Sequence, residues 1–180
     1  AIMGASGSGK STFMNMLGCL DKPNSGSYFL DNIDVLHLNS NELASIRNLK
    51  MGFVFQGFNL ISRTTALENV QLPMIYKGIP EEERIKRAHE VLKIVGLEGR
   101  EDHMPNQISG GQQQRVAMIR ALVQPFDFIL VDEPISHLDE TNSRIMGEIM
   151  MEEAKRQGAG VIVTSIGKHI DLPYEKVLHL

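Results

Sequence analysis

Gly4-Ala5-Ser6-Gly7-Ser8-Gly9-Lys10-Ser11 is the stretch that decides the fold, because it fits the pattern G-x-x-x-x-G-K-[ST] of a phosphate-binding loop, or P-loop. Its glycines let backbone N–H groups turn inward onto phosphate oxygens, Lys10 reaches the β- and γ-phosphates, and Ser11 can ligate Mg²⁺. The pattern predicts a short strand at residues 1–3 and a helix over residues 11–17. Ordinary Gly/Ser turns sometimes match it too, so the rest of the chain has to support the interpretation.

A second phosphate-binding pattern lies in Ile108-Ser109-Gly110-Gly111-Gln112-Gln113-Gln114-Arg115. It should open a helix over residues 110–123, whose free N–H groups and dipole favour an anion at its start. Two such helix starts in one small domain are difficult to use on a single nucleotide unless two copies of the chain face each other. The pair therefore predicts a dimer with ATP at its interface.

The bulk properties are those of one soluble globular domain: 180 residues, 42% of them hydrophobic, and a net charge of −4. A net negative charge gives no indication of the basic surface that binds nucleic acid. Cys19 is the only cysteine, which excludes an internal disulfide and favours a place in the core. No apolar run is long enough to span a bilayer and no signal peptide is visible, so we expect a cytoplasmic protein.

Strands and helices alternate along the chain, which predicts an α/β fold with a P-loop NTPase core and a mainly parallel sheet. Besides residues 1–3, we expect strands at residues 27–30, 51–55, 127–131, 161–164 and 176–180. Further helices are expected over residues 40–49, after Thr65, from Pro80, and over residues 140–157. Residues 57–119 should form a mostly helical insert, a lobe within a single domain spanning residues 1–180. Since residues 1–3 are short for the strand before a P-loop, we also expect truncated N-terminal strands.

Asp132 ends the apolar run of residues 128–131, and the C-terminal strand ends of an α/β sheet are where ligands bind. Asp132 can hold Mg²⁺, and Glu133 can polarise a water molecule aimed at the γ-phosphate. Gln56 follows another predicted strand and could contact either the Mg²⁺ or that water. A plain acidic turn is the alternative for Asp132 and Glu133, and the two phosphate-binding motifs make it the weaker interpretation.

Five segments resemble the ATP-binding cassette (ABC) ATPases, and they occur in that family's order: residues 4–12, Phe55-Gln56, residues 109–113, residues 130–134 and Leu138-Asp139. The resemblance covers essentially the whole chain, and Ser-Gly-Gly-Gln is a highly specific part of it. Three stretches look closest to the macrolide-exporter and lipoprotein-releasing branch: residues 18–23, 67–70 and 109–115.

The resemblance implies a head-to-tail dimer, in which ATP on the P-loop of one copy is closed over by residues 109–112 of the other. It implies catalytic roles for Glu133, Gln56 and Lys10, and a Mg²⁺ site formed by Ser11, Gln56 and Asp132. The expected nucleotide contacts are Gly4, Ser6, Gly7, Ser8, Gly9, Lys10, Ser11, Thr12, Ser109, Gly110, Gly111, Gln112, Asp139 and Ser165. Asp139 would help to join the two sites across the dimer.

The family resemblance also implies partners. Gln56 would lie on the loop that senses a membrane-spanning permease subunit, and the helical insert would receive that subunit's coupling helix. A second ATPase subunit completes the dimer, which is expected to be a homodimer with no nucleic acid bound. The chain would then work peripherally on the inner face of the cell membrane.

Ser165 departs from the family pattern, which usually has a histidine there in contact with the γ-phosphate. A serine hydroxyl reaches less far and carries no positive charge, which predicts slower or differently organised hydrolysis. His169 is an alternative to that histidine, but it lies four residues further along the chain, and a surface histidine is the better interpretation.

Two functions remain open on these residues. The first is an ATPase subunit that powers a membrane transporter of the exporting or lipoprotein-extracting type. The alternative, favoured by Ser165, is a regulatory nucleotide-binding module of a membrane complex with weak or no hydrolysis. A role in DNA repair or translation fits poorly, because the chain has no long coiled-coil arm, second cassette or basic surface.

Overall fold

The computed structural model describes residues 1–133, 140–166 and 174–180. Six α-helices lie in these ranges: α1 (Lys10–Leu17), α2 (Ser40–Lys50), α3 (Ala66–Tyr76), α4 (Glu81–Ile94), α5 (Gly110–Leu122) and α6 (Glu140–Gln157). The strands are β1 (Ile2–Met3), β2 (Phe29–Leu30), β3 (Ile33–Asp34), β4 (Met51–Val54), β5 (Phe128–Asp132), β6 (Gly160–Ser165) and β7 (Leu178–His179). Short 3-10 helices cover Val35–His37 and Pro105–Gln107. None of the helices described is long and apolar enough to cross a membrane.

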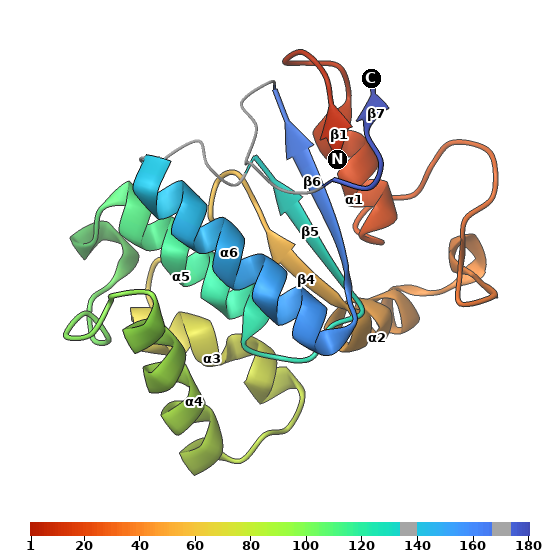
Figure 1. Cartoon of the computed structure of the whole chain (residues 1–180). Helices are drawn as coiled ribbons and strands as arrows, with labels where there is room; N and C mark the ends of the chain where they lie inside the picture. The colour runs from red at the N-terminus through yellow and green to blue at the C-terminus, as the bar shows by residue number, and fades with distance from the viewer. Residues whose placement is uncertain (134–139, 167–173) are drawn as a thin grey trace.

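The main sheet has the strand order β4-β5-β6-β1-β7, and every neighbouring pair in it is parallel. Figure 1 shows these strands side by side, with the P-loop leaving the tip of β1. Because the strands are parallel, the C-terminal ends of β1, β4, β5 and β6 lie at one edge of the sheet. The register at that edge pairs Asp132 with Thr164, and Met3 with Ser165. The predicted α/β architecture with a mainly parallel sheet is confirmed.

Helices cover both faces of the sheet, and strand β5 shows why its sequence is continuously apolar. Ile129 and Val131 point to one face, into the buried cluster that they share with residues of α3, α5 and α6. Leu130 points to the other face, where it packs with Met14 of α1 and with Cys19. Successive side chains of a strand alternate between faces, so a strand covered on both sides needs apolar residues throughout. Figure 1 shows α5 and α6 on one side of the sheet and α1 on the other.

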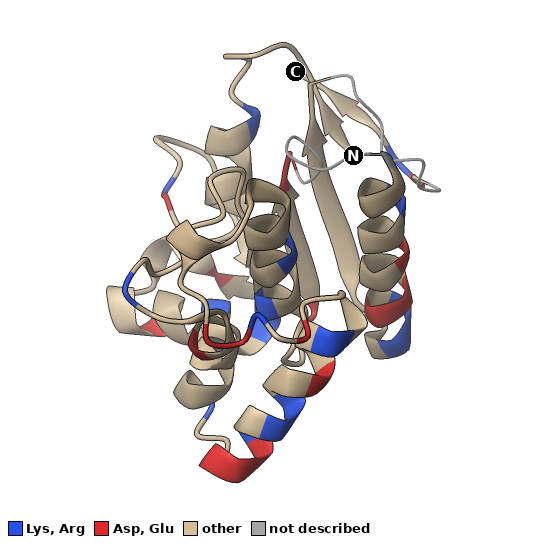
Figure 2. Cartoon of the chain, turned by 90° about the vertical axis from the view of Figure 1, so that its left-hand side faces the viewer, with Lys and Arg blue, Asp and Glu red and all other residues tan. Residues whose placement is uncertain are grey.

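The helical segment begins with the capping box predicted at Thr65. The Thr65 backbone N–H donates to Glu68 Oε2 at 2.8 Å, and the Glu68 N–H donates to Thr65 Oγ1 at 3.1 Å. Helix α4 begins at Glu81, just after Pro80, and three glutamates in its first turn complement the helix dipole. Figure 2 shows acidic residues at this end of α4 and mixed charges along it. Helices α3 and α4 pack on α5 in the same buried cluster as the sheet.

A small hairpin was not predicted. Strands β2 and β3 pair antiparallel, so the expected strand at residues 27–30 is shortened to Phe29–Leu30 and gains a partner. Asp31 and Asn32 form the two-residue turn, with φ angles of +49° and +63°. Two adjacent residues with positive φ are typical of a type I′ hairpin turn, and Asp and Asn tolerate that conformation. The Asp31-Asn32 pair between apolar residues is the sequence signal from which this turn could have been predicted.

Candidate active site

The shape of the loop after β1 depends on glycine at three of its positions. Gly7 and Gly9 have φ angles of +82° and +96°, a region that L side chains rarely adopt. Gly4 is required for a different reason, because a Cβ there would lie 2.5 Å from Ser8 Oγ and 2.6 Å from the Leu180 carbonyl oxygen. These positions let the backbone curl closely around a small ligand.

The inside of this loop is rich in hydrogen-bond donors. Gly9 is the N-cap of α1 and offers no side chain, so no side-chain cap satisfies the N–H groups of the first helical turn. Lys10 is only 4% exposed, and its Nζ donates to the carbonyl oxygens of Gly4 and Ala5, each at 2.9 Å. Ser8 Oγ is buried and has no hydrogen-bond partner within residues 1–133, 140–166 and 174–180. A buried ammonium, an unsatisfied hydroxyl and an uncapped helix start fit a phosphate group.

Other residues that we expect to contact the nucleotide lie around the edge of the P-loop. Ser6, Ser11 and Thr12 are exposed to solvent, the last two on the first turn of α1. Ser165 ends β6 next to β1, and its carbonyl oxygen accepts a hydrogen bond from the Gly4 N–H at 3.3 Å. The sheet therefore carries Ser165 to the start of the loop.

Gln56 and Glu133 come from different strand ends and touch each other. Gln56 Nε2 donates to Glu133 Oε2 at 2.9 Å, although the two residues are 77 positions apart. Gln56 follows β4 and Glu133 follows Asp132, the last residue of β5, the strand that pairs with β4. The structure thus joins two residues that the sequence suggested separately, at the same edge of the sheet as the P-loop.

The donor set at this edge suits a hard cation that also binds phosphate. Asp132 offers a carboxylate, Ser11 a hydroxyl and Gln56 an amide oxygen, which are oxygen ligands of the kind Mg²⁺ prefers. Within the described ranges, no three His, Cys, Asp or Glu side chains come close enough together to hold a metal by themselves. Mg²⁺ sites commonly use one or two carboxylates and complete their shell with waters and substrate phosphates, so these residues fit the ion.

Thr164 is a site residue that sequence reasoning missed. It is fully buried at 0% exposure; its hydroxyl donates to Asp132 Oδ1 and accepts from the Glu133 backbone N–H at 3.1 Å. Glu133 has a φ of +47°, which is unfavourable for a residue with a side chain. The Thr164 hydroxyl therefore links Asp132 to Glu133 and stabilises the unfavourable backbone conformation at Glu133. A threonine directly after the apolar run of residues 161–163 was the available signal.

Thr164→Val should destabilise the chain while keeping nearly the same shape. Valine removes the hydroxyl and leaves the Asp132 carboxylate and the Glu133 N–H without their partner. Loss of such a buried partner costs about 1–3 kcal/mol in the free energy of unfolding. Urea denaturation measures this difference, and Thr164→Ser, which retains the hydroxyl, is the matched control. Equal stability of the valine and serine variants would contradict this role of the hydroxyl.

The second phosphate-binding motif lies at the N-terminus of α5, on the far side of the sheet from α1 (Figure 1). Ser109 Oγ accepts from the Gln112 N–H at 3.3 Å, and Gln112 Oε1 accepts from the Ser109 N–H at 2.9 Å. This capping box fixes the helix start, with Gly110 and Gly111 as its first residues. One chain does not bring this motif onto its own P-loop. Asp139 and His169 lie outside the described residues.

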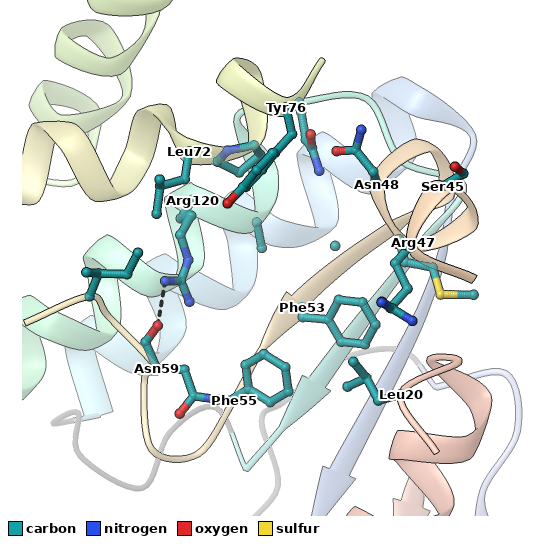
Figure 3. A pocket seen from close by; sticks show the side chains of 17 residues that line it. Leu20, Ser45, Arg47, Asn48, Phe53, Phe55, Asn59, Leu72, Tyr76 and Arg120 are labelled. Atoms are coloured by element: carbon teal, nitrogen blue, oxygen red, sulfur yellow. Dashed lines mark hydrogen bonds between the residues drawn. The ribbon is translucent and has the colours of Figure 1, made fainter. Parts of the chain in front are cut away.

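A groove of about 710 Å³ lies between α2, β4, α3 and α5. The rings of Phe53 and Phe55 stack on its floor with centroids 5.5 Å apart, and Tyr76 stands on its rim with 74% of its surface exposed. Among the residues that the structure describes, Arg47 and Arg120 are the only charged side chains lining it. Figure 3 shows both guanidinium groups beside the aromatic floor. The groove is therefore apolar with a positive character.

Comparison with known proteins agrees with this geometry. The family described as "ABC transporter" matches residues 1–136. The chain is 52% identical over 164 residues to the ABC transporter ATP-binding protein YvrO of Bacillus subtilis, covering 91% of this chain and 71% of that protein. It is 51% identical over 170 residues to the macrolide export ATP-binding/permease protein MacB of Brucella melitensis. That match covers 94% of this chain but 26% of MacB, so the chain spans about a quarter of such exporters.

Solved structures give the same result. The chain superposes with a TM-score of 0.86 and 49% identity on the ATP-binding cassette MJ0796 in a dimeric, post-hydrolysis state bound to ADP and Pi. The match covers 91% of this chain and 72% of that one. A second dimeric structure of MJ0796, a bacterial ABC transporter cassette, superposes with a TM-score of 0.84.

Proposed function

This chain belongs to the family of ABC transporter ATP-binding proteins, and from that premise we propose that it hydrolyses ATP to drive a membrane transporter of the exporting or lipoprotein-extracting type. The observation that carries the proposal is the Gln56–Glu133 contact beside Asp132, at the same sheet edge as the P-loop. A simple nucleotide-binding module would have no need for a positioned base next to a Mg²⁺ ligand. The similarity to MacB favours the exporter branch.

The P-loop of one copy would hold the nucleotide, and Ser109, Gly110 and Gln112 of a second copy would close over it. In one chain the two motifs lie on different sides of the sheet, so a head-to-tail pair is the arrangement that uses both. The N–H groups at the start of α5 would then face the γ-phosphate, where the helix dipole favours negative charge. The solved structures of MJ0796 are dimeric, which supports a dimer, and we propose that this chain forms a homodimer on ATP.

Each residue of the site has a defined task in this proposal. Lys10 neutralises the β- and γ-phosphates, and Glu133 accepts a proton from the attacking water while Gln56 holds its carboxylate in place. Bound Mg²⁺ supplies charge neutralisation at the phosphates, and Ser11, Gln56 and Asp132 are the residues that would hold it. Ser165 would offer a neutral hydroxyl in place of an imidazole, so we expect slow turnover.

We test this function by phosphate release from MgATP, with the Glu133→Gln variant as the background. Release clearly above that background supports an ATPase. Intact ATP binding without such release would instead favour the regulatory alternative that Ser165 suggested.

The groove beside Phe53 and Phe55 would receive the membrane partner. We propose that the occupant is a short helical segment of a permease subunit, with an apolar face and at least one carboxylate. The aromatic floor fits the apolar face. The two arginines, with no acidic residue among the described side chains that line the groove, fit the carboxylate. The single domain, with residues 57–119 as its helical insert, would then work peripherally on the inner face of the membrane.

Tyr76→Glu should weaken binding of such a permease segment by at least about tenfold, because it removes an aromatic contact and adds repulsion toward the partner's carboxylate. Co-purification of the permease subunit with the tagged chain measures this loss. Leu49→Glu is the matched control, since Leu49 is 62% exposed on α2 but does not line the groove. Equal loss in both variants would show that surface charge, and not the groove, controls association.

A further inference from the structure

The segment after β4 has a backbone that its own sequence does not favour. Phe58 has a φ angle of +60°, which is unfavourable for a bulky residue, and Asn59, whose side chain tolerates this region, follows it at +48°. Inside the segment, the Phe58 N–H donates to the Phe55 carbonyl at 3.0 Å and the Asn59 N–H to the Gly57 carbonyl at 2.7 Å. Backbone strain of this kind persists only where surrounding structure over-determines it, so contacts from outside the segment are needed.

Arg120 provides these contacts from α5. Its Nη1 donates to the Asn59 carbonyl oxygen at 2.7 Å, and its Nη2 donates to the Phe58 carbonyl oxygen at 2.9 Å. Figure 3 shows the guanidinium reaching from α5 toward Asn59. Partial burial of the side chain lowers its pKa from the ordinary arginine value and strengthens its hydrogen bonds. A planar fork of donors can serve two neighbouring carbonyls at once, which the single ammonium of lysine does less well.

The segment that Arg120 holds also carries Gln56. Gln56 lies two residues before Phe58, and its Nε2 donates to Glu133 Oε2 at 2.9 Å. A shift in the path of residues 57–59 would move Gln56 away from that carboxylate. The geometry of the proposed base thus depends on a guanidinium from a different helix, 61 residues from Asn59 along the chain.

We propose that Arg120 is a positioning residue for ATP hydrolysis, which locks residues 56–59 so that Gln56 stays against Glu133. The inference rests on the proposed ATPase function. Arg120 touches neither nucleotide nor water in this role, and it acts through the loop. The same guanidinium lines the groove, so a molecule that binds in the groove and moves Arg120 would also change the position of Gln56.

The test compares Arg120→Gln with Arg120→Lys and Arg87→Gln. Arg87 also donates from its guanidinium to a backbone carbonyl oxygen, Nη2 to Val123 at 3.0 Å, but it does not line the groove and this bond does not go to the loop. We expect Arg120→Gln to lower kcat for phosphate release by about 10- to 100-fold with little change in KM, because the P-loop is untouched. Arg120→Lys should be intermediate, and Arg87→Gln should stay near the unmodified chain.

Hydrogen exchange supplies a second measurement that does not need turnover. In Arg120→Gln, amides of residues 56–61 should exchange faster, while those of α3 and of the start of α5 keep their protection. An equal kcat loss in Arg87→Gln, a change confined to KM, or unaltered exchange in the loop would each overturn the proposal. If the unmodified chain releases no phosphate above Glu133→Gln, the proposed function fails, and exchange in the loop still decides whether Arg120 holds it.

Discussion

Glu133→Gln is expected to slow phosphate release from MgATP by about 10²- to 10⁴-fold, the range typical for removal of a general base. Glutamine has nearly the same shape and its amide oxygen can still accept from Gln56, so the contact at 2.9 Å is preserved. The amide cannot take up a proton from water, which is the function that we assign to the carboxylate. Phosphate release under saturating MgATP measures the change.

ATP binding should survive in Glu133→Gln, because the P-loop is unaltered. Dimers would then accumulate with ATP and persist, and size-exclusion chromatography should detect them. Glu148→Gln is the matched control: it makes the same chemical change on α6, where Glu148 accepts a hydrogen bond from Arg144 at 2.8 Å on the surface. If Glu133→Gln retained more than about a tenth of the unmodified rate, the base would have to be another group.

Lys10→Met should weaken ATP binding by about 100-fold or more. Hydrogen bonds from a charged group contribute about 1.5–3 kcal/mol each. The Lys10 ammonium donates to the Gly4 and Ala5 carbonyl oxygens in this structure, and we expect it to reach phosphate oxygens when ATP is bound. A loss of about 3 kcal/mol of such contacts corresponds to roughly two orders of magnitude in Kd. Methionine keeps the apolar stem in its buried position but supplies no donor and no charge. Titration with a fluorescent ATP analogue measures the affinity.

Lys22→Met is the control for Lys10→Met. Lys22 also donates to two backbone carbonyl oxygens, those of Leu36 at 2.9 Å and Leu38 at 3.1 Å, but it lies outside the P-loop. Its replacement should leave the ATP affinity unchanged. If both variants changed the Kd for ATP by less than about threefold, the assignment of Lys10 to the phosphate site would be wrong.

Much of the local structure followed from nearby residues. The P-loop at residues 4–11, the capping box at Thr65 and Glu68, and helix α6 all lie where the sequence predicted them. In each case the deciding interaction joins residues only a few positions apart. The β2–β3 hairpin escaped prediction because its two-residue strands are too short for a periodic pattern.

The contacts between distant residues could not be predicted in the same way. Sequence reasoning placed Gln56 and Glu133 separately at strand ends, but their pairing required β4 and β5 to be neighbours in one register. Thr164 and Arg120 were missed, because neither belongs to a motif and each acts on residues 31 to 62 positions away. The groove, which combines residues from four elements, is likewise invisible in a linear pattern.

From the sequence alone we predicted a phosphate loop, a second helix start suited to an anion, and an acidic pair at a strand end. These features depend on glycine dihedrals, helix capping and strand polarity, which neighbouring residues set. The contacts of Gln56 with Glu133 and of Arg120 with the loop at Phe58 and Asn59 depend on the three-dimensional packing of the chain. The physical reason is that strand order, register and helix packing come from burial of the whole core, and no short segment contains that information.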